Sequence, residues 1–185
     1  NNYDIVNINY PSTKYGMSDL SELITNKINS IIDKNRKVNF VGFSLGGVLI
    51  RAILKDKESF PNLGRVVQIA PPNHGSELVD ILKRFWLFRK IFGLSGIQLS
   101  TDQTEILDLF GEVYYDLGII AGMNSIAPIS SLIIPGIDDG KVSVESTKLN
   151  GMKDHIVISS SHIFFPKNKK THMQVLSFLK TGNFE

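Results

Sequence analysis

A serine between two glycines stands where a predicted strand passes directly into a predicted helix. The stretch is Gly42-Phe43-Ser44-Leu45-Gly46, a G-x-S-x-G pattern that, at such a position, is typical of a sharp turn with a strained serine backbone. Glycines are expected on both sides because larger side chains there would collide with neighbouring elements. The Ser44 hydroxyl would then project above the sheet as a nucleophile, and the Leu45 N–H would stabilise a developing oxyanion.

The same pattern also has a purely structural interpretation. In that case the glycines relieve packing at a tight turn and Ser44 caps the helix. The strand before the pattern and the helix after it favour the nucleophile. Phe43, beside the serine, is then a candidate for lining the pocket.

A serine hydroxyl becomes a good nucleophile when a base removes its proton, and the chain offers four histidines and no cysteine. His162 is favoured because it follows the predicted strand 155–159 in a loop, from which it would reach over the carboxyl end of the sheet. His172, within the last predicted helix, is the alternate. His155 should point away from that edge, and His74 would line the site or orient a loop. Otherwise these are ordinary surface or core imidazoles.

A carboxylate is needed to orient the imidazole, and two adjacent candidates follow the apolar run 132–134. Asp139, next to Gly140, fits a turn that aims its carboxylate at the imidazole Nδ1. Asp138 is the alternate and would hydrogen-bond the turn. Both could instead be turn formers, or ligands of a hard cation, for which one loop offers too few oxygens. The chain order Ser, Asp, His favours a triad over these two interpretations, and Asp139 is the favoured orienting acid.

Hydrophobic patterning predicts the elements that would position these residues. Apolar residues recur at helical spacing after Ser18, the expected N-cap of the first helix. The expected strands cover 5–10, 38–43, 65–70, 117–121, 132–134 and 155–159, and the expected helices cover 18–32, 46–54, 76–88 and 170–180. Strands that alternate with helices predict an α/β fold with a mostly parallel sheet covered on both faces.

The 185 residues, 42% of them hydrophobic, predict a single domain spanning 1–185. A net charge of +2 and the lack of a recognised binding motif argue against a nucleic-acid partner. Without cysteine there is no disulfide or thiolate metal site, and the sequence predicts neither a metal nor a cofactor. The longest apolar stretch, 85–99, is interrupted by Arg89 and Lys90 and is too short to cross a bilayer.

Taken together, these motifs resemble the α/β-hydrolase superfamily, and more narrowly the bacterial lipase-like esterases related to triacylglycerol lipases. The resemblance covers nearly the whole chain. It rests on Tyr10-Pro11-Ser12 and on the stretches VGFSLGGVLIR, GRVVQIAPPNHGSEL, DDGKVSVEST, SSSHIFF and FLKTGNF. It implies hydrolysis of carboxylic esters through an acyl-enzyme, with Ser44, Asp139 and His162 at the positions of the family's triad.

The resemblance also implies features that this sequence does not display. The family's fold begins with a further strand and a His-Gly loop that supplies a second oxyanion N–H, whereas this chain begins at Asn1, without Met, as if cut from something longer. We therefore expect one α/β-hydrolase domain without the family's first strand or strands. Removal of an upstream segment is compatible with this start, and the sequence does not indicate the compartment.

The segment 74–111 is expected to form a small cap-like insertion between core strands, where the superfamily often inserts caps. Its apolar residues would contact an acyl chain, and its basic residues suggest peripheral contact with a lipid surface. In the alternative, these aromatics pack into the core. The apolar residues are Phe85, Trp86, Leu87, Phe88, Ile91, Phe92, Leu94 and Ile97, and the basic ones Arg84, Arg89 and Lys90.

The favoured function is hydrolysis of small-molecule esters, with lipid-like or acyl esters as the expected substrates. A thioesterase or an acyltransferase would use the same triad. A binding module could keep the hydrolase fold without catalysis, because fold alone does not determine function. The oligomeric state is not indicated by the sequence.

Overall fold

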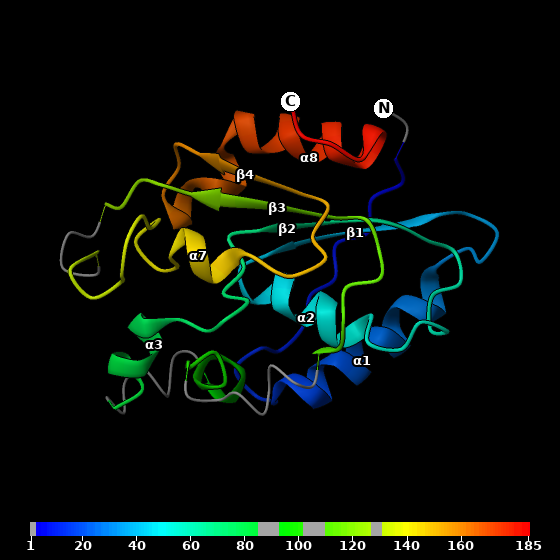
Figure 1. Ribbon diagram of the computed structural model, residues 1–185. Coiled ribbons are helices and arrows are strands. Elements are labelled where there is room, and N and C mark those ends of the chain that lie inside the picture. The colour runs from blue at the N-terminus through cyan, green and yellow to red at the C-terminus, as the bar shows by residue number, and fades with distance from the viewer. Residues whose placement is uncertain (1–2, 85–92, 102–109, 127–130) are drawn as a thin grey trace.

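A computed structural model of the chain describes residues 3–84, 93–101, 110–126 and 131–185. Its centre is a four-stranded sheet in the order β1-β2-β3-β4, in which every neighbouring pair is parallel (Figure 1). The strands are β1 Val38–Phe43, β2 Leu63–Ile69, β3 Leu117–Gly122 and β4 Asp154–Ile158. All six residues of β3 are buried, as expected for a parallel strand covered on both faces.

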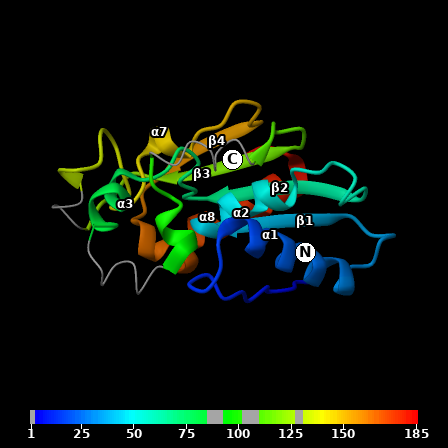
Figure 2. The same ribbon diagram turned by 90° about the horizontal axis from the view of Figure 1, so that it is seen from below.

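Helices cover the two faces of this sheet, as the alternating pattern predicts. Figures 1 and 2 show α1 and α2 on one face and α8 on the other. The bounds are α1 Met17–Ile31, α2 Leu45–Ile53, α3 Glu77–Leu82, α7 Val144–Thr147, the 3₁₀ helix η2 His162–Lys167 and α8 Lys169–Thr181. None of the helices that the described ranges contain has the length and apolar character that crossing a bilayer requires.

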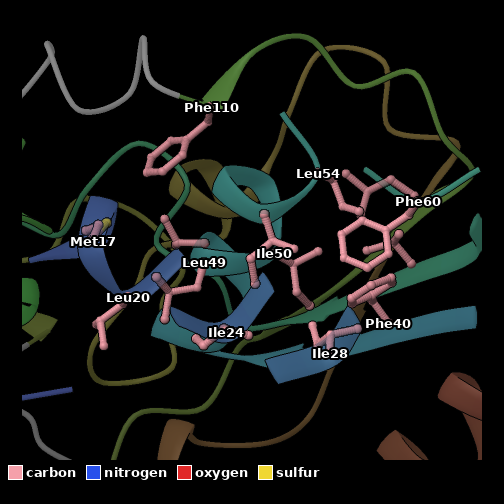
Figure 3. Packing of buried hydrophobic residues seen from close by; sticks show 14 of the residues in the cluster. Met17, Leu20, Ile24, Ile28, Phe40, Leu49, Ile50, Leu54, Phe60 and Phe110 are labelled. Atoms are coloured by element: carbon pink, nitrogen blue, oxygen red, sulfur yellow. The ribbon is translucent and has the colours of Figure 1, made fainter. Parts of the chain in front are cut away.

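Most of the hydrophobic core lies between the sheet and the two helices α1 and α2 (Figure 3). The apolar spacing of α1 places Leu20, Ile24 and Ile28 on its buried face. On the opposite face, the Phe178 ring of α8 lies so close to Gly118 of β3 that a Cβ there would be 2.6 Å from it. Burial of apolar area on both faces is the main favourable term in the stability of this fold.

The N-cap of helix α1 lies two residues before the expected one. Its N-cap is Gly16, which has no side chain, and not Ser18. The Met17 N–H is instead bound by the Gln98 side chain, with 2.7 Å between the backbone nitrogen and Oε1. A contact from 81 residues further along the chain supplies the cap, so local patterning could not locate it.

Two expected strands are absent, and in both cases the prediction was wrong. Residues 5–10 form no strand, because within the described ranges they have no strand partner, and Ile5 is 87% exposed. The run 132–134 is a turn in which Leu132 is 87% exposed. Three apolar residues stopped by Pro135 are too few to enter the sheet, so β3 is the strand that precedes the candidate acid.

The expected cap insertion is described only in part. Helix α3 ends at Leu82, and residues 85–88 of the predicted helix lie outside the described residues, as do Ile91 and Phe92. The described stretch 93–101 packs on the loop before α1, where Ser95 Oγ donates to the Ser12 carbonyl. Leu94 is 57% exposed, whereas Ile97 is partly buried.

The outer edge of β1 is open in the part of the chain that the structure describes. Figure 2 shows β1 at one edge of the sheet, and its recorded partner is β2. A groove of about 890 Å³ runs along this edge between β1 and residues 3–10, with α1 and α2 as its floor. It extends to Phe43 and Gly46 at the end of the strand.

The turn from β1 into α2 consists of Ser44 alone, with φ 52° and ψ −123°. A Cβ on Gly42 would lie 2.5 Å from the Gly46 carbonyl oxygen and 2.6 Å from the Gly47 nitrogen. A Cβ on Gly46 would meet only the Tyr10 hydroxyl, at 3.4 Å. Of the two motif glycines, therefore, Gly42 is the one that the described packing requires, and the expected collision at Gly46 is not found there.

We predict that the two glycines respond differently to alanine. Gly42→Ala forces a methyl group against backbone that cannot move aside, and should lower the free energy of unfolding by about 2 kcal/mol or more. Gly46→Ala adds a methyl group in van der Waals contact and removes a flexible residue from a helix, so its change should stay within about 1 kcal/mol of zero. Urea denaturation of both variants measures this, and equal losses would contradict the prediction.

Candidate active site

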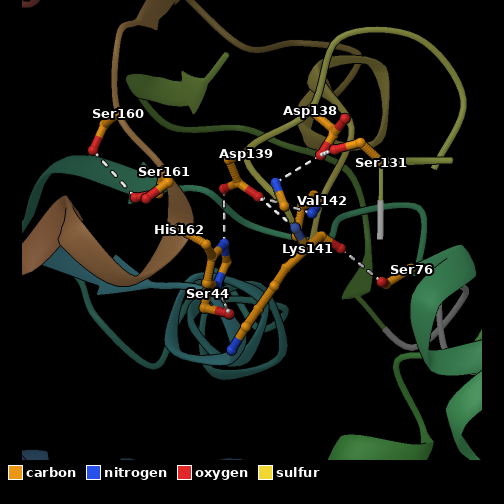
Figure 4. A network of polar contacts seen from close by, with 11 residues as sticks. Ser44, Ser76, Ser131, Asp138, Asp139, Lys141, Val142, Ser160, Ser161 and His162 are labelled. Carbon is orange, nitrogen blue, oxygen red and sulfur yellow. Dashed lines mark hydrogen bonds and ion pairs between the residues drawn. The ribbon is translucent and has the colours of Figure 1, made fainter. Parts of the chain in front are cut away.

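The three favoured residues lie together at the carboxyl edge of the sheet. Ser44 directly follows β1, Asp139 lies in the connection between β3 and β4, and His162 begins η2 after β4. Because parallel strands end at the same edge, residues 118 positions apart in the chain become neighbours. Figure 4 shows their side chains pointing toward one another.

These side chains form a continuous hydrogen-bonded chain. The Ser44 Oγ lies 3.0 Å from Nε2 of His162, and Nδ1 of His162 lies 2.7 Å from Oδ2 of Asp139. With the Nδ1 proton donated to the carboxylate, Nε2 is left to accept the serine proton. The geometry therefore suits transfer of a proton from Ser44 to a correctly oriented imidazole.

The Asp139 carboxylate is held by backbone as well as by the imidazole. Its Oδ1 accepts from the N–H of Lys141 at 3.0 Å and of Val142 at 2.9 Å. The His162 N–H donates to the Asp139 carbonyl at 2.9 Å, so main chain joins the two residues too. Asp139 is 2% exposed and His162 is 5% exposed. These hydrogen bonds compensate the buried carboxylate and fix its direction.

Asp138, the alternate acid, hydrogen-bonds within its own turn. Its Oδ1 accepts from the Gly140 N–H at 2.7 Å and from the Ser131 hydroxyl at 2.9 Å. The structure does not bring it to His162. No group of three or more metal-ligating side chains occurs in the described ranges. Asp138 therefore stabilises the turn, whereas Asp139 binds both the turn and the imidazole of His162.

Packing around the imidazole involves residues that sequence reasoning missed. A Cβ on Gly122, the last residue of β3, would lie 2.6 Å from the Ser160 carbonyl oxygen and 2.7 Å from Cβ of Asp139. Glycine at the end of β3 therefore lets the acid turn and the histidine loop approach each other. The sequence signal was a glycine at the end of a buried strand. Its role could not be inferred from it, because that role depends on which loops meet there.

Phe43 flanks the imidazole, as expected of a pocket residue. Its ring centroid lies 5.0 Å from that of His162 and 6.3 Å from that of Phe165. The Phe43 side chain is 36% exposed, so it offers an apolar surface beside the serine. Phe165 is buried and packs against the Phe43 ring.

The other histidines have no recorded hydrogen bond to Ser44 within the described residues. His172 is exposed in α8, with Nε2 3.0 Å from the Pro166 carbonyl. His155 contacts Thr147 Oγ1 at 3.0 Å, and its burial holds the pKa below the ordinary value. His74 is exposed in the loop after β2, where its N–H donates to the Ser146 carbonyl at 3.1 Å. Its imidazole has no recorded hydrogen bond within the described ranges.

Leu45 is the first residue of α2, and the first N–H groups of a helix have no intrahelical acceptor. The Ser44 carbonyl accepts from the N–H of Gly47 at 2.9 Å. No acceptor for the Leu45 N–H is recorded among the described residues. This N–H is therefore a donor without a recorded acceptor. It lies next to the serine, at the positive end of the nine-residue helix α2.

A buried polar network fixes α2 beneath the serine. Gln68 Nε2 donates to the Gly47 carbonyl at 2.7 Å, and Asn73 Nδ2 donates to Gln68 Oε1 at 2.9 Å. Arg51 donates to the Asn73 carbonyl at 3.2 Å and lies 4.8 Å from the centroid of the Phe110 ring. Burial lowers the pKa of Arg51 to about 10. The network joins α2, β2 and the loop after β2 into one support.

No protein-family model matches the chain, and no curated protein matches it. Several solved structures do. The mature form of Bacillus licheniformis lipase BlEst2 is 19% identical, with a TM-score of 0.73 over 94% of this chain and 76% of that chain. Phospholipase PlaB from Legionella pneumophila is 16% identical, with a TM-score of 0.68 over 95% and 51%.

A metagenomic carboxyl esterase, MGS0156, is 15% identical, with a TM-score of 0.64 over 82% of this chain and 52% of that chain. Type II thioesterases are also among the similar structures. This chain spans about half the length of PlaB and of MGS0156. At such identities the comparisons establish the fold. The chain has the α/β-hydrolase fold, with a parallel sheet and helices on both faces.

Proposed function

We propose that this protein hydrolyses carboxylic esters, with Ser44 as nucleophile, His162 as general base and Asp139 as orienting acid. The observation that carries the proposal is the unbroken chain of hydrogen bonds from Ser44 Oγ through the imidazole to Oδ2 of Asp139. The lipase and esterase titles of the similar structures support the same reaction class. Lipid-like or acyl esters are the proposed substrates.

The reaction would proceed through an acyl-enzyme. His162 Nε2 takes the Ser44 proton as Oγ bonds to the carbonyl carbon, and the Leu45 N–H hydrogen-bonds the oxyanion. The bond to the alcohol oxygen then breaks, and His162 returns the proton to that oxygen. A water molecule, deprotonated by His162, attacks the acyl group, and the acid leaves as Ser44 regains its proton.

The oxyanion needs a second donor in most enzymes of this mechanism, and the open edge of β1 is the place we propose for it. The Ser44 N–H donates to the Ile69 carbonyl of β2, so every second residue before it in β1 also directs its N–H and carbonyl groups to β2. Val41 and Phe43 direct their N–H and carbonyl groups to the groove instead. A strand in that groove would run toward Phe43 and Gly46 at the end of β1, which agrees with the further strand that the sequence resemblance implies.

Two alternatives share this site. Thioester cleavage or acyl transfer would use the same nucleophile and base, and the thioesterase titles of two similar structures favour including thioesters among the substrates tested. A non-catalytic binding module would keep the pocket and leave Ser44 unreactive. Phe43 provides the apolar surface beside the serine in every case.

Removing the nucleophile should remove the activity. Ser44→Ala should lower kcat for a series of p-nitrophenyl esters of increasing acyl length by about 10⁴-fold or more, and should abolish labelling by a fluorophosphonate probe. Ser30→Ala is the matched control, because Ser30 is exposed on α1 and its recorded hydrogen bond is to the Lys27 carbonyl of the same helix. Equal activity of wild type and Ser44→Ala would refute the proposal, and an unlabelled, inactive but folded wild type would favour the binding module.

Substitution of the two adjacent aspartates should have different effects on kcat. Asp139→Asn removes the charge that orients His162, and should lower kcat by about 10³- to 10⁴-fold. Asp138→Asn keeps an oxygen that can accept from Gly140, so its effect on kcat should be less than about tenfold. Steady-state kinetics of both variants, with folding checked by circular dichroism, measures the difference. A larger loss in Asp138→Asn would exchange the roles of the two residues.

A further inference from the structure

Lys141 lies in the turn that holds the candidate acid, and its main chain is tied on both sides. Its N–H donates to Asp139 Oδ1 at 3.0 Å, and its carbonyl accepts from the Ser76 hydroxyl at 2.9 Å. These bonds fix the position from which the side chain leaves the turn. They need only the backbone of Lys141, so its side chain is not required for the hydrogen bonding of Asp139.

The Lys141 side chain is exposed and extends into the site. Figure 4 shows it running away from the Asp139 carboxylate, past His162, towards the end of the site where Ser44 lies. The neighbouring carboxylates of Asp138 and Asp139 accept from other donors. Within the described ranges no ion pair or hydrogen bond is recorded for the Lys141 ammonium. A flexible stem with a compact positive charge is therefore directed at the reaction centre.

The direction of approach indicates which part of an ester this charge would meet. His162 returns its proton to the leaving alcohol in the proposed reaction, so the alcohol part lies on the imidazole side of the scissile carbonyl. Lys141 enters from that side, because its turn also carries the acid bonded to His162. An ammonium there would attract a negative group carried by the alcohol.

We propose that Lys141 is a specificity-determining residue that favours esters whose alcohol part carries a negative charge, such as a phosphate or sulfonate. This inference rests on the proposed ester hydrolysis. At a solvent-exposed site the attraction between two unit charges corresponds to about a five- to tenfold preference. The preference should weaken with ionic strength, because exposed charges are screened by salt.

The test compares two butyrate esters that differ in one negative charge. One is the ester of 4-hydroxybenzenesulfonate and the other the ester of N,N-dimethyl-4-hydroxybenzenesulfonamide. The quantity measured is the ratio of their kcat/KM values, in which the acyl group and ring cancel. The proteins are wild type, Lys141→Met, Lys141→Arg and the control Lys34→Met, which removes an exposed lysine from the loop before β1. A second pair, 1-butanoylglycerol and its 3-phosphate, repeats the comparison with a phosphate.

We expect Lys141→Met to lower the ratio of anionic to neutral ester about five- to tenfold, mainly through KM of the anionic ester. Lys141→Arg should retain most of the ratio, and Lys34→Met should match wild type. Raising NaCl from about 20 mM to about 500 mM should reduce the wild-type ratio and leave that of Lys141→Met nearly constant. A purely structural role of Lys141 would change both esters alike, and this result, or an unchanged ratio, would overturn the inference.

If folded wild type hydrolyses neither ester, the proposed ester hydrolysis fails instead. Binding of the same two compounds, followed by isothermal titration calorimetry of wild type and Lys141→Met, then decides the inference separately. Tighter binding of the anionic compound that depends on Lys141 would support it. Equal affinities in the two proteins would overturn it.

Discussion

A buried carboxylate must be fully hydrogen-bonded, and this requirement at Asp139 organises the rest of the site. Two consecutive backbone N–H groups, of Lys141 and Val142, and the imidazole of His162 meet the requirement. The first two belong to the turn after Asp139, and the third comes from the loop after β4. The loop after β4 therefore has to close on the acid turn, and in doing so it sets the direction of the imidazole toward Ser44.

The parallel sheet makes this closure geometrically available. Every strand ends at the same edge, so the connections after β1, β3 and β4 leave the sheet close to one another. Gly122 then allows the acid turn and the loop after β4 to come into contact, since any side chain at that position would separate them. On the serine side, Gly42 has the same function, and the network of Gln68, Asn73 and Arg51 holds α2 in place beneath the turn.

The errors of the sequence-based prediction have a common cause. Residues 5–10 alternate like a strand, but a strand exists only where a neighbour accepts its hydrogen bonds, and the described residues offer none. The run 132–134 is apolar, yet it forms a turn and does not enter the sheet. The first helix begins at Met17, whose N–H is bound by the distant Gln98. In each case a partner remote in sequence, or its absence, decided the outcome.

The sequence by itself determined the alternation of strands and helices, the strand-to-helix turn at Ser44 and the order in which serine, aspartate and histidine follow one another. These are local properties, expressed in hydrophobic period and in glycine positions. The sequence favoured Asp139 over the adjacent Asp138, but only the tertiary structure shows that the carboxylate of Asp139 binds the imidazole of His162 while that of Asp138 binds groups of its own turn. The tertiary structure also decided that Lys141 extends toward Ser44 and that β1 has an open edge, because such relations depend on which elements pack together.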